Sequence, residues 1–81
     1  MKIITEDTPN YDFTPREKDI LPLLVRGLKN EDIANILYIS VSTVKANLTS
    51  IFEKLGVDNR TQAAAKILAE NLIPHRDSEQ P

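Results

Sequence analysis

The chain has 81 residues, of which 41% are hydrophobic, and its ten basic and twelve acidic side chains give a formal net charge of −2. This length supports one small domain, which buries only about 60% of the surface that its unfolded chain exposes. The absence of cysteine excludes a disulfide framework and a thiolate metal site, and no apolar run approaches the ~20 residues of a membrane span.

The excess of acidic residues lies at the two ends of the chain. Between residues 14 and 66, eight basic side chains stand against six acidic ones, a net charge of +2 that weakly favours phosphate. The N-terminal residues MKII are followed by acids instead of a signal-peptide apolar region, so we expect a cytoplasmic protein. We interpret residues 1–13 as an N-terminal arm or linker, residues 14–73 as the domain and residues 74–81 as a flexible tail.

A first helix is predicted over residues 15–27. Thr14 and Glu17 form a T-x-x-E capping box at its start, with a proline between them at the first helical position. Apolar residues keep their helical spacing through Pro22, so we expect one kinked helix instead of two. Gly27 is typical of a helix C-terminus.

Two further helices are predicted over residues 31–38 and 41–55, and a tight connection joins them. Asn30 is the candidate N-cap of the first, with two acids in the first turn where the helix dipole favours them. Ser40 is the candidate N-cap of the second. This pair of helices is the part of the chain that the rest is expected to support.

The packing of these two helices also has a sequence signal. Ala34 and Val44 lie ten residues apart, and a small residue followed by a β-branched one suits two helices that cross closely. This arrangement is typical of a helix-turn-helix unit.

The helix predicted over residues 41–55 has two different faces. At about 100° per residue its apolar residues gather on one side, and the opposite side is small, hydroxylated and amide-bearing. Such side chains let a helix approach base edges in the DNA major groove, whereas a purely structural helix usually carries long charged residues there. We therefore interpret it as a DNA-recognition helix. The residues predicted to face outward are Ala46, Thr49, Ser50 and Glu53, flanked by Thr43, Lys45, Asn47 and Lys54.

A fourth helix is predicted over residues 60–73. Asn59 and Gln62 form an N-x-x-Q variant of the capping box, and Pro74 is expected to stop the helix. Its apolar residues cover more than one face, so one part closes the core and an alanine-rich surplus would let a second copy approach. Core filling alone is the alternative interpretation.

No catalytic constellation is found in the sequence. His75 is the only histidine, metal-ligand spacing is absent, and both glycines are explained as helix ends, so no Gly-rich phosphate loop remains. We expect no enzyme activity, no cofactor and no metal.

The flanking segments make a family resemblance specific. TPREKDILPLLVRGLKNEDIA, YIS, STVK, KLGV and NRTQA stand in the order and at the separations of the LuxR/NarL-type helix-turn-helix domain of bacterial transcription regulators. The chain resembles this family from about Phe13 to about Leu72. The resemblance implies an all-α, compact four-helix fold, base reading by residues 41–55 and dimerisation of the DNA-bound domain through the last helix.

The family pattern also implies residue roles. Lys45, Ala46 and Thr49 occupy the positions that face bases, and the remaining candidates look like phosphate or flanking contacts. Asn47 stands where the family often has histidine and Thr49 where it is often basic, so we expect these departures to affect the strength of DNA binding more than the fold. The predicted DNA-binding residues are Thr43, Lys45, Ala46, Asn47, Thr49, Ser50, Lys54, Arg60 and Thr61, and the predicted dimerisation residues are Ala64, Ala65, Leu68 and Leu72.

Three functions are compatible with these patterns. The first is sequence-specific binding of double-stranded DNA at an inverted-repeat operator, by a stand-alone transcription regulator or the effector domain of a longer one. This regulator would be a homodimer that is weak without DNA, and RNA polymerase is a further candidate partner. The second is a protein-interaction module that pairs with a related regulator through the last helix, which the acidic total favours and the polar outer face of residues 43–50 opposes. The third is a sigma-factor region, which normally carries more basic recognition residues.

Overall fold

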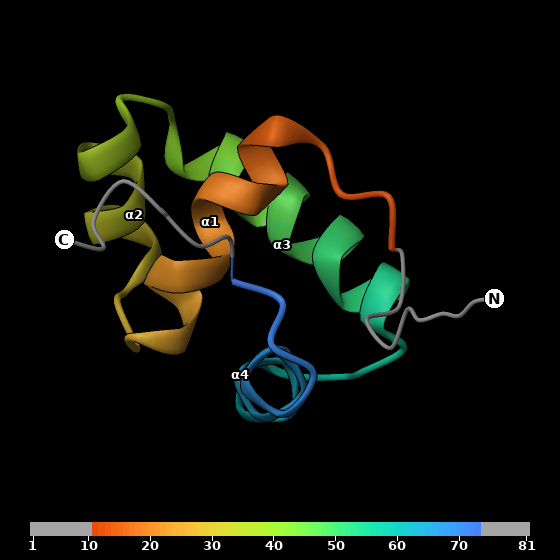
Figure 1. Cartoon of the computed structure of the whole chain (residues 1–81). Helices are drawn as coiled ribbons and strands as arrows, with labels where there is room; N and C mark the ends of the chain where they lie inside the picture. The colour runs from red at the N-terminus through yellow and green to blue at the C-terminus, as the bar shows by residue number, and fades with distance from the viewer. Residues whose placement is uncertain (1–10, 74–81) are drawn as a thin grey trace, which may run out of the picture.

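The structure, a computed structural model, describes residues 11–73. Its four helices are α1 (Pro15–Val25), α2 (Asn30–Leu37), α3 (Val41–Leu55) and α4 (Arg60–Ala69), and no strand occurs within residues 11–73 (Figure 1). The predicted all-α, four-helix fold is therefore confirmed. The predicted arm, apart from its last three residues, and the predicted tail lie outside the described residues.

Side-chain caps start α1 and α3 as predicted. The Thr14 hydroxyl accepts a hydrogen bond from the backbone N–H of Glu17 at 3.1 Å, and Oε1 of Glu17 accepts from the backbone N–H of Thr14 at 2.9 Å. The hydroxyl of Ser40 accepts from the backbone N–H of Thr43 at 3.0 Å. These bonds satisfy N–H groups that have no partner inside the helix. α1 then continues through Pro22 as one helix.

Two other predicted caps differ in the structure. Asn59 caps α4 by accepting from the backbone N–H of Gln62 at 2.9 Å, but the Gln62 side chain accepts from the N–H of the residue before the cap. The prediction that Asn30 caps α2 was wrong, because Lys29 is the N-cap residue and Asn30 is the first residue of the helix. The Asn30 side chain is engaged elsewhere, since it accepts a hydrogen bond from the guanidinium of Arg60.

Residues in the left-handed conformation follow or end the helices. Gly27 has a φ of 81° and Gly56 a φ of 71°, where glycine has no Cβ to clash. The predicted stops at these glycines are confirmed, although the last helical residue of α1 is Val25 and not residue 27. Tyr38 adopts the same conformation with a φ of 59°, so α2 ends at Leu37 and not at residue 38.

The last helix is shorter than predicted. α4 ends at Ala69 instead of residue 73, because Asn71 turns the chain with a φ of 56°. Asparagine is the common alternative to glycine at this position, and the backbone N–H of Leu72 donates back to the carbonyl of Ile67 at 2.9 Å. Leu72 and Ile73 thus leave the helix and pack partly buried against the core.

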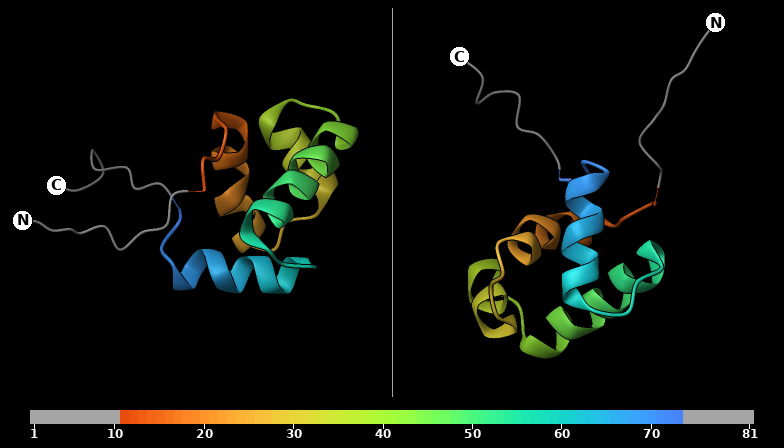
Figure 2. Two further views of the ribbon diagram at one scale, coloured as in Figure 1. Left: turned by 90° about the vertical axis from the view of Figure 1, so that its right-hand side faces the viewer. Right: turned by 90° about the horizontal axis from the view of Figure 1, so that it is seen from below.

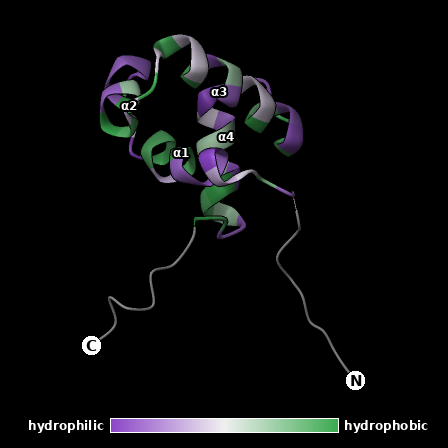
Figure 3. Ribbon diagram, turned by 90° about the horizontal axis from the view of Figure 1, so that it is seen from above, coloured by the Kyte–Doolittle hydropathy of each residue, from purple (hydrophilic) through white to green (hydrophobic). Residues whose placement is uncertain are grey.

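The core is aliphatic and draws on all four helices. α1 packs against α4 and α3, and α2 packs mainly against α3. Figure 2 shows α4 crossing one end of the α1–α3 pair, and Figure 3 shows hydrophilic and hydrophobic stretches alternating along the helices, as expected for helices with one buried face. Ala34 and Val44 are both buried, as the predicted close crossing of α2 and α3 requires. The buried hydrophobic residues are Ile20, Leu21, Leu23, Leu24, Ile33, Ala34, Val44, Leu48, Ile51, Leu55, Ala63 and Ile67.

Replacement of a core leucine on α3 tests this packing. Leu48 is 6% exposed, so we expect Leu48→Ala to leave a cavity and lower the free energy of unfolding by about 2–5 kcal/mol. Urea titration followed by circular dichroism measures the change. The neighbouring exposed Thr49→Ala is the control, and we expect it to unfold close to the parent midpoint. A loss below about 1 kcal/mol for Leu48→Ala would show that this side of α3 does not form the core.

Candidate nucleic-acid interface

The outer face of α3 carries the residues predicted to read DNA. Val44 and Leu48 are buried on the inner side, whereas Lys45, Ala46 and Thr49 are exposed on the other. This split confirms the predicted orientation of Ala46 and Thr49. It follows from the four- and three-residue spacing of the apolar positions, which the other core helices cover.

The polar side chains of this face are held by the helix itself. The Thr49 hydroxyl donates to the carbonyl of Lys45 at 3.1 Å, and the Asn47 amide donates to the carbonyl of Thr43 at 2.8 Å. Both side chains keep an oxygen that can still accept, and the Asn47 amide keeps one N–H that can still donate. The face therefore offers a DNA duplex hydrogen-bond acceptors, donors from Lys45 and Asn47, and methyl groups from Ala46 and Thr49.

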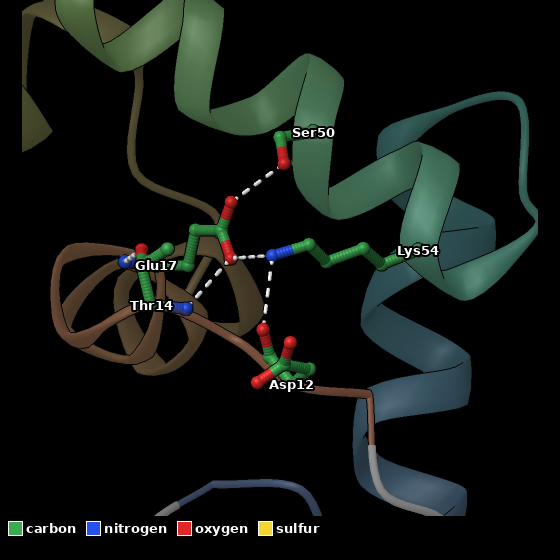
Figure 4. Close-up of polar contacts among 5 residues, drawn as sticks. All are labelled: Asp12, Thr14, Glu17, Ser50 and Lys54. Carbon is green, nitrogen blue, oxygen red and sulfur yellow. Dashed lines mark hydrogen bonds and ion pairs between the residues drawn. The ribbon is translucent and has the colours of Figure 1, made fainter.

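Ser50 and Lys54 lie differently from the prediction. The Ser50 hydroxyl donates to Oε2 of Glu17 at 2.6 Å, and the Lys54 ammonium lies 2.6 Å from Oε1 of the same carboxylate (Figure 4). Lys54 also donates to the backbone carbonyl of Asp12 at 3.1 Å. The prediction that Ser50 faces outward was wrong, because this edge of α3 lies beside the start of α1, where a buried carboxylate requires partners.

Glu17 is the buried charged residue at the centre of these contacts, with 3% of its surface exposed. Burial alone raises the pKa of Glu17, but hydrogen bonds from Lys54, Ser50 and the Thr14 N–H outweigh it, so the pKa lies below its ordinary value. Sequence reasoning found only the capping role of this residue. The missing signal was spatial, because the carboxylate has a second oxygen and its partners lie more than thirty residues away.

Residues 11–13 connect to the same cluster. The Phe13 ring centre lies 5.8 Å from the Lys54 ammonium and 5.6 Å from the ring centre of Tyr11. The Tyr11 hydroxyl donates to Oε1 of Glu70 at 2.6 Å, and this bond, burial and the negative charge of Glu70 together raise the pKa of Tyr11. The segment that leads into α1 is therefore attached to α3 and to the end of α4.

Arg60, at the start of α4, has contacts within the domain in addition to its predicted role as a phosphate contact. Arg60 donates through its guanidinium to the carbonyl of Leu28 at 3.2 Å and to the side chain of Asn30. Thr61, beside it, is exposed. Arg60 therefore joins α4 to the α1–α2 connection, a structural role that sequence reasoning missed.

The predicted dimerisation residues are not all on one surface. Leu68 is 60% exposed, Ala65 is exposed and Ala64 is half-buried on α4. Leu72 lies beyond the end of this helix and packs partly against the core, so its predicted place on the helix surface was wrong. The exposed part of the stripe is thus shorter than the sequence indicated.

Neither a candidate metal site nor a candidate membrane span is found in the described part of the chain. Residues 11–73 hold no group of three or more His, Cys, Asp or Glu side chains that could bind a metal ion. No helix in the same range is both long and apolar enough to cross a membrane.

The short α2, the tight connection and the longer α3 with its exposed polar face define a helix-turn-helix domain. A sequence profile described as "Bacterial regulatory proteins, luxR family" matches residues 12–67. The chain therefore belongs to the luxR family of bacterial regulatory proteins, a family of DNA-binding transcription regulators and not a class of enzymes.

Similar proteins place the chain within this family. It is 40% identical over 65 residues to "Transcriptional regulatory protein LiaR" of Bacillus subtilis, covering 80% of this chain and 31% of the relative. It is 42% identical over 61 residues to "Response regulator protein VraR" of Staphylococcus aureus, covering 75% and 29%. The crystal structure of "Response Regulator ChrA in Heme-Sensing Two Component System" superposes with a TM-score of 0.74 and 44% identity, covering 82% and 33%. The chain thus spans about a third of the length of these proteins.

The Glu17 cluster predicts an acid-dependent stability. Because the folded state lowers the pKa of Glu17 below its ordinary value of 4.5, the stabilisation is fully present above that value. It is lost as the pH falls below 4.5 and through the lower pKa of the folded state. We expect Glu17→Gln to lower the free energy of unfolding near neutral pH by about 1–3 kcal/mol, since Lys54 loses its counter-charge.

Urea titrations of the parent and Glu17→Gln at a series of pH values between about 7 and 3 measure this effect. We expect the variant to lose less stability than the parent on acidification. Asp19→Asn is the matched control, because Asp19 is an exposed carboxylate on the same helix, and it should keep the parent's pH dependence. Equal slopes for Glu17→Gln and the parent would contradict the assignment.

Proposed function

We propose that the domain binds double-stranded DNA sequence-specifically as part of a transcription regulator, with α3 in the major groove. The observation that supports this most directly is the exposure of Lys45, Ala46 and Thr49 along one side of a helix whose other side is buried. Such a helix fits the groove in width, and short side chains bring its axis close to the base edges.

The proposed contacts divide by chemistry. Ala46 and the methyl group of Thr49 suit the methyl group of thymine, while the Thr49 oxygen can accept from a base amino group. Lys45 can reach a guanine edge or a phosphate. The candidate contacts to the DNA backbone are Thr43, Asn47 and Thr61. Contacts of this kind set the position of a protein on DNA without reading the base sequence.

The charged residues on and beside the outer face of α3 limit its affinity for DNA. Glu53 is exposed on α3, and Lys54 is paired with Glu17, so neither adds to phosphate binding. We expect about three to five phosphate contacts per protomer, a low number for a DNA-binding domain. Binding then depends more on the fit of α3 to the base edges than on a general electrostatic attraction to phosphates.

The exposed residues of α4 support a two-fold complex on DNA. Ala64 and Ala65 are small enough to let a second α4 approach, and Leu68 supplies an exposed apolar side chain. A two-fold protein pair binds an inverted repeat, with half-sites spaced near one helical turn. Pairing through Leu68 with a related regulator, without DNA binding, is the alternative that the same exposed leucine favours.

Substitutions on the outer face of α3 test the DNA-binding proposal. We expect Ala46→Glu and Thr49→Glu to abolish sequence-specific binding, because a carboxylate would face bases and phosphates, while the thermal midpoint stays near the parent value. Ile36→Glu is the control, since it introduces the same carboxylate at a 48% exposed position in the cleft between α1 and α2, outside both the outer face of α3 and the exposed residues of α4. Fluorescence anisotropy with a duplex selected from a random-sequence pool measures binding. Parent-like binding by Thr49→Glu would rule out α3 as the reading helix.

The assembly state gives a second test. Two α4 surfaces of this size would bury less than the ~1,200 Å² of a stable interface, and association has an entropic cost of several kcal/mol. We expect a monomer at micromolar concentration by analytical ultracentrifugation and cooperative binding to paired half-sites in gel-shift titrations, since one DNA molecule raises the effective concentration of the second protomer. A tight dimer without DNA, or equal affinity per half-site on single and paired sites, would contradict this.

A further inference from the structure

An open hollow of about 390 Å³ lies where α2, α3 and α4 begin. Three basic residues line it from different segments: Lys29 at the N-cap of α2, Lys45 on α3 and Arg60 at the first position of α4. Glu31 is the one acidic residue in the lining that the structure describes. The hollow therefore carries three positive charges against one negative charge, in a chain whose total charge is −2.

Among the residues that the structure describes, the basic residues of the hollow differ from other basic residues of the domain because they are not in ion pairs. Elsewhere in the domain Arg16 pairs with Asp19, Lys54 with Glu17 and Lys66 with Glu70. Within residues 11–73, by contrast, no carboxylate lies within ion-pair distance of Lys29, Lys45 or Arg60. Of the five basic residues that remain without an ion pair in this range, three line the same hollow.

The positively charged side chain of Arg60 is held in a fixed position in the lining of the hollow. Its guanidinium donates to the carbonyl of Leu28 and to the amide oxygen of Asn30, both of which are neutral. These bonds hold the planar group in place without cancelling its charge. A guanidinium has five N–H donors, so donors remain for an anion. Lys29 and Lys45 are exposed at the rim, where flexible side chains can adjust to a bound group.

We propose that this hollow binds one backbone phosphate of duplex DNA, held by Lys29, Lys45 and Arg60 together. The inference rests on the proposed function, because the ligand belongs to the same duplex that α3 reads. Lys45 belongs both to the hollow and to the outer face of α3, so a phosphate bound here lies next to the groove. Such a contact fixes the register of α3 on the duplex, and Lys45 then acts on a phosphate and not on a base.

Single charge substitutions around the hollow test the proposal. We expect Lys29→Met and Lys45→Met each to weaken binding to selected and to unrelated duplexes alike, by about three- to tenfold at low salt. Each should lower the slope of log affinity against log salt by about one. Glu31→Gln should strengthen binding to both duplexes. Lys18→Met is the matched control, because Lys18 lines a separate cleft between α1 and α2.

A neutral phosphate locates the contact on the DNA. Duplexes with a methylphosphonate at a single position are titrated with the parent and with Lys29→Met. At one position the substitution should lower the affinity of the parent but leave the affinity of Lys29→Met almost unchanged. Thermal midpoints confirm that the variants are folded.

Two results would show that the hollow is not the phosphate site: Lys29→Met, Lys45→Met and Lys18→Met weaken DNA binding equally, or every methylphosphonate effect adds to the effect of Lys29→Met. If the parent still binds duplex DNA, the proposed function stands in either case. A parent that shows no duplex binding overturns both.

Discussion

The burial of one carboxylate, that of Glu17, is the constraint on which the geometry of the interface depends. Its two oxygens cap the start of α1, accept from Ser50 and pair with Lys54, and Lys54 in turn holds the backbone of Asp12 (Figure 4). A buried charge without partners is strongly unfavourable, so these groups must stay together. The second half of α3 is thereby fixed against α1, while the outer face of the helix, with Lys45, Ala46 and Thr49, stays exposed.

The sides of α3 have different roles, and the burial of Glu17 accounts for one of them. Its buried side packs on the other helices, its edge near α1 is used by Glu17, and its outer face keeps Lys45, Ala46 and Thr49 exposed. Basic residues are divided in the same way. Lys54, which pairs with the buried Glu17, stabilises the domain, and the basic residues around the hollow at the start of α3 carry the positive charge that a phosphate requires.

Local patterns predicted most of the fold, and contacts distant in sequence account for the errors. The capping box at Thr14, the cap at Ser40 and the two faces of α3 depend on residues within one or two helical turns, so periodicity and spacing revealed them. Ser50 was misplaced because Glu17, its partner, lies in another helix. The end of α4 was missed because Asn71, and not the predicted Pro74, turns the chain. The role of Arg60 likewise depends on a loop in another part of the sequence.

We infer that the outer face of α3 and the hollow beside it form one DNA-binding surface. Amide chemical shifts of the ¹⁵N-labelled domain, titrated with a duplex selected from a random-sequence pool, test this most directly. We expect the largest changes at Ala46 and Thr49 and at Lys29, Lys45 and Arg60, and we expect an unrelated duplex to shift mainly Lys29, Lys45 and Arg60. Changes confined to α4, or identical changes with both duplexes, would contradict it.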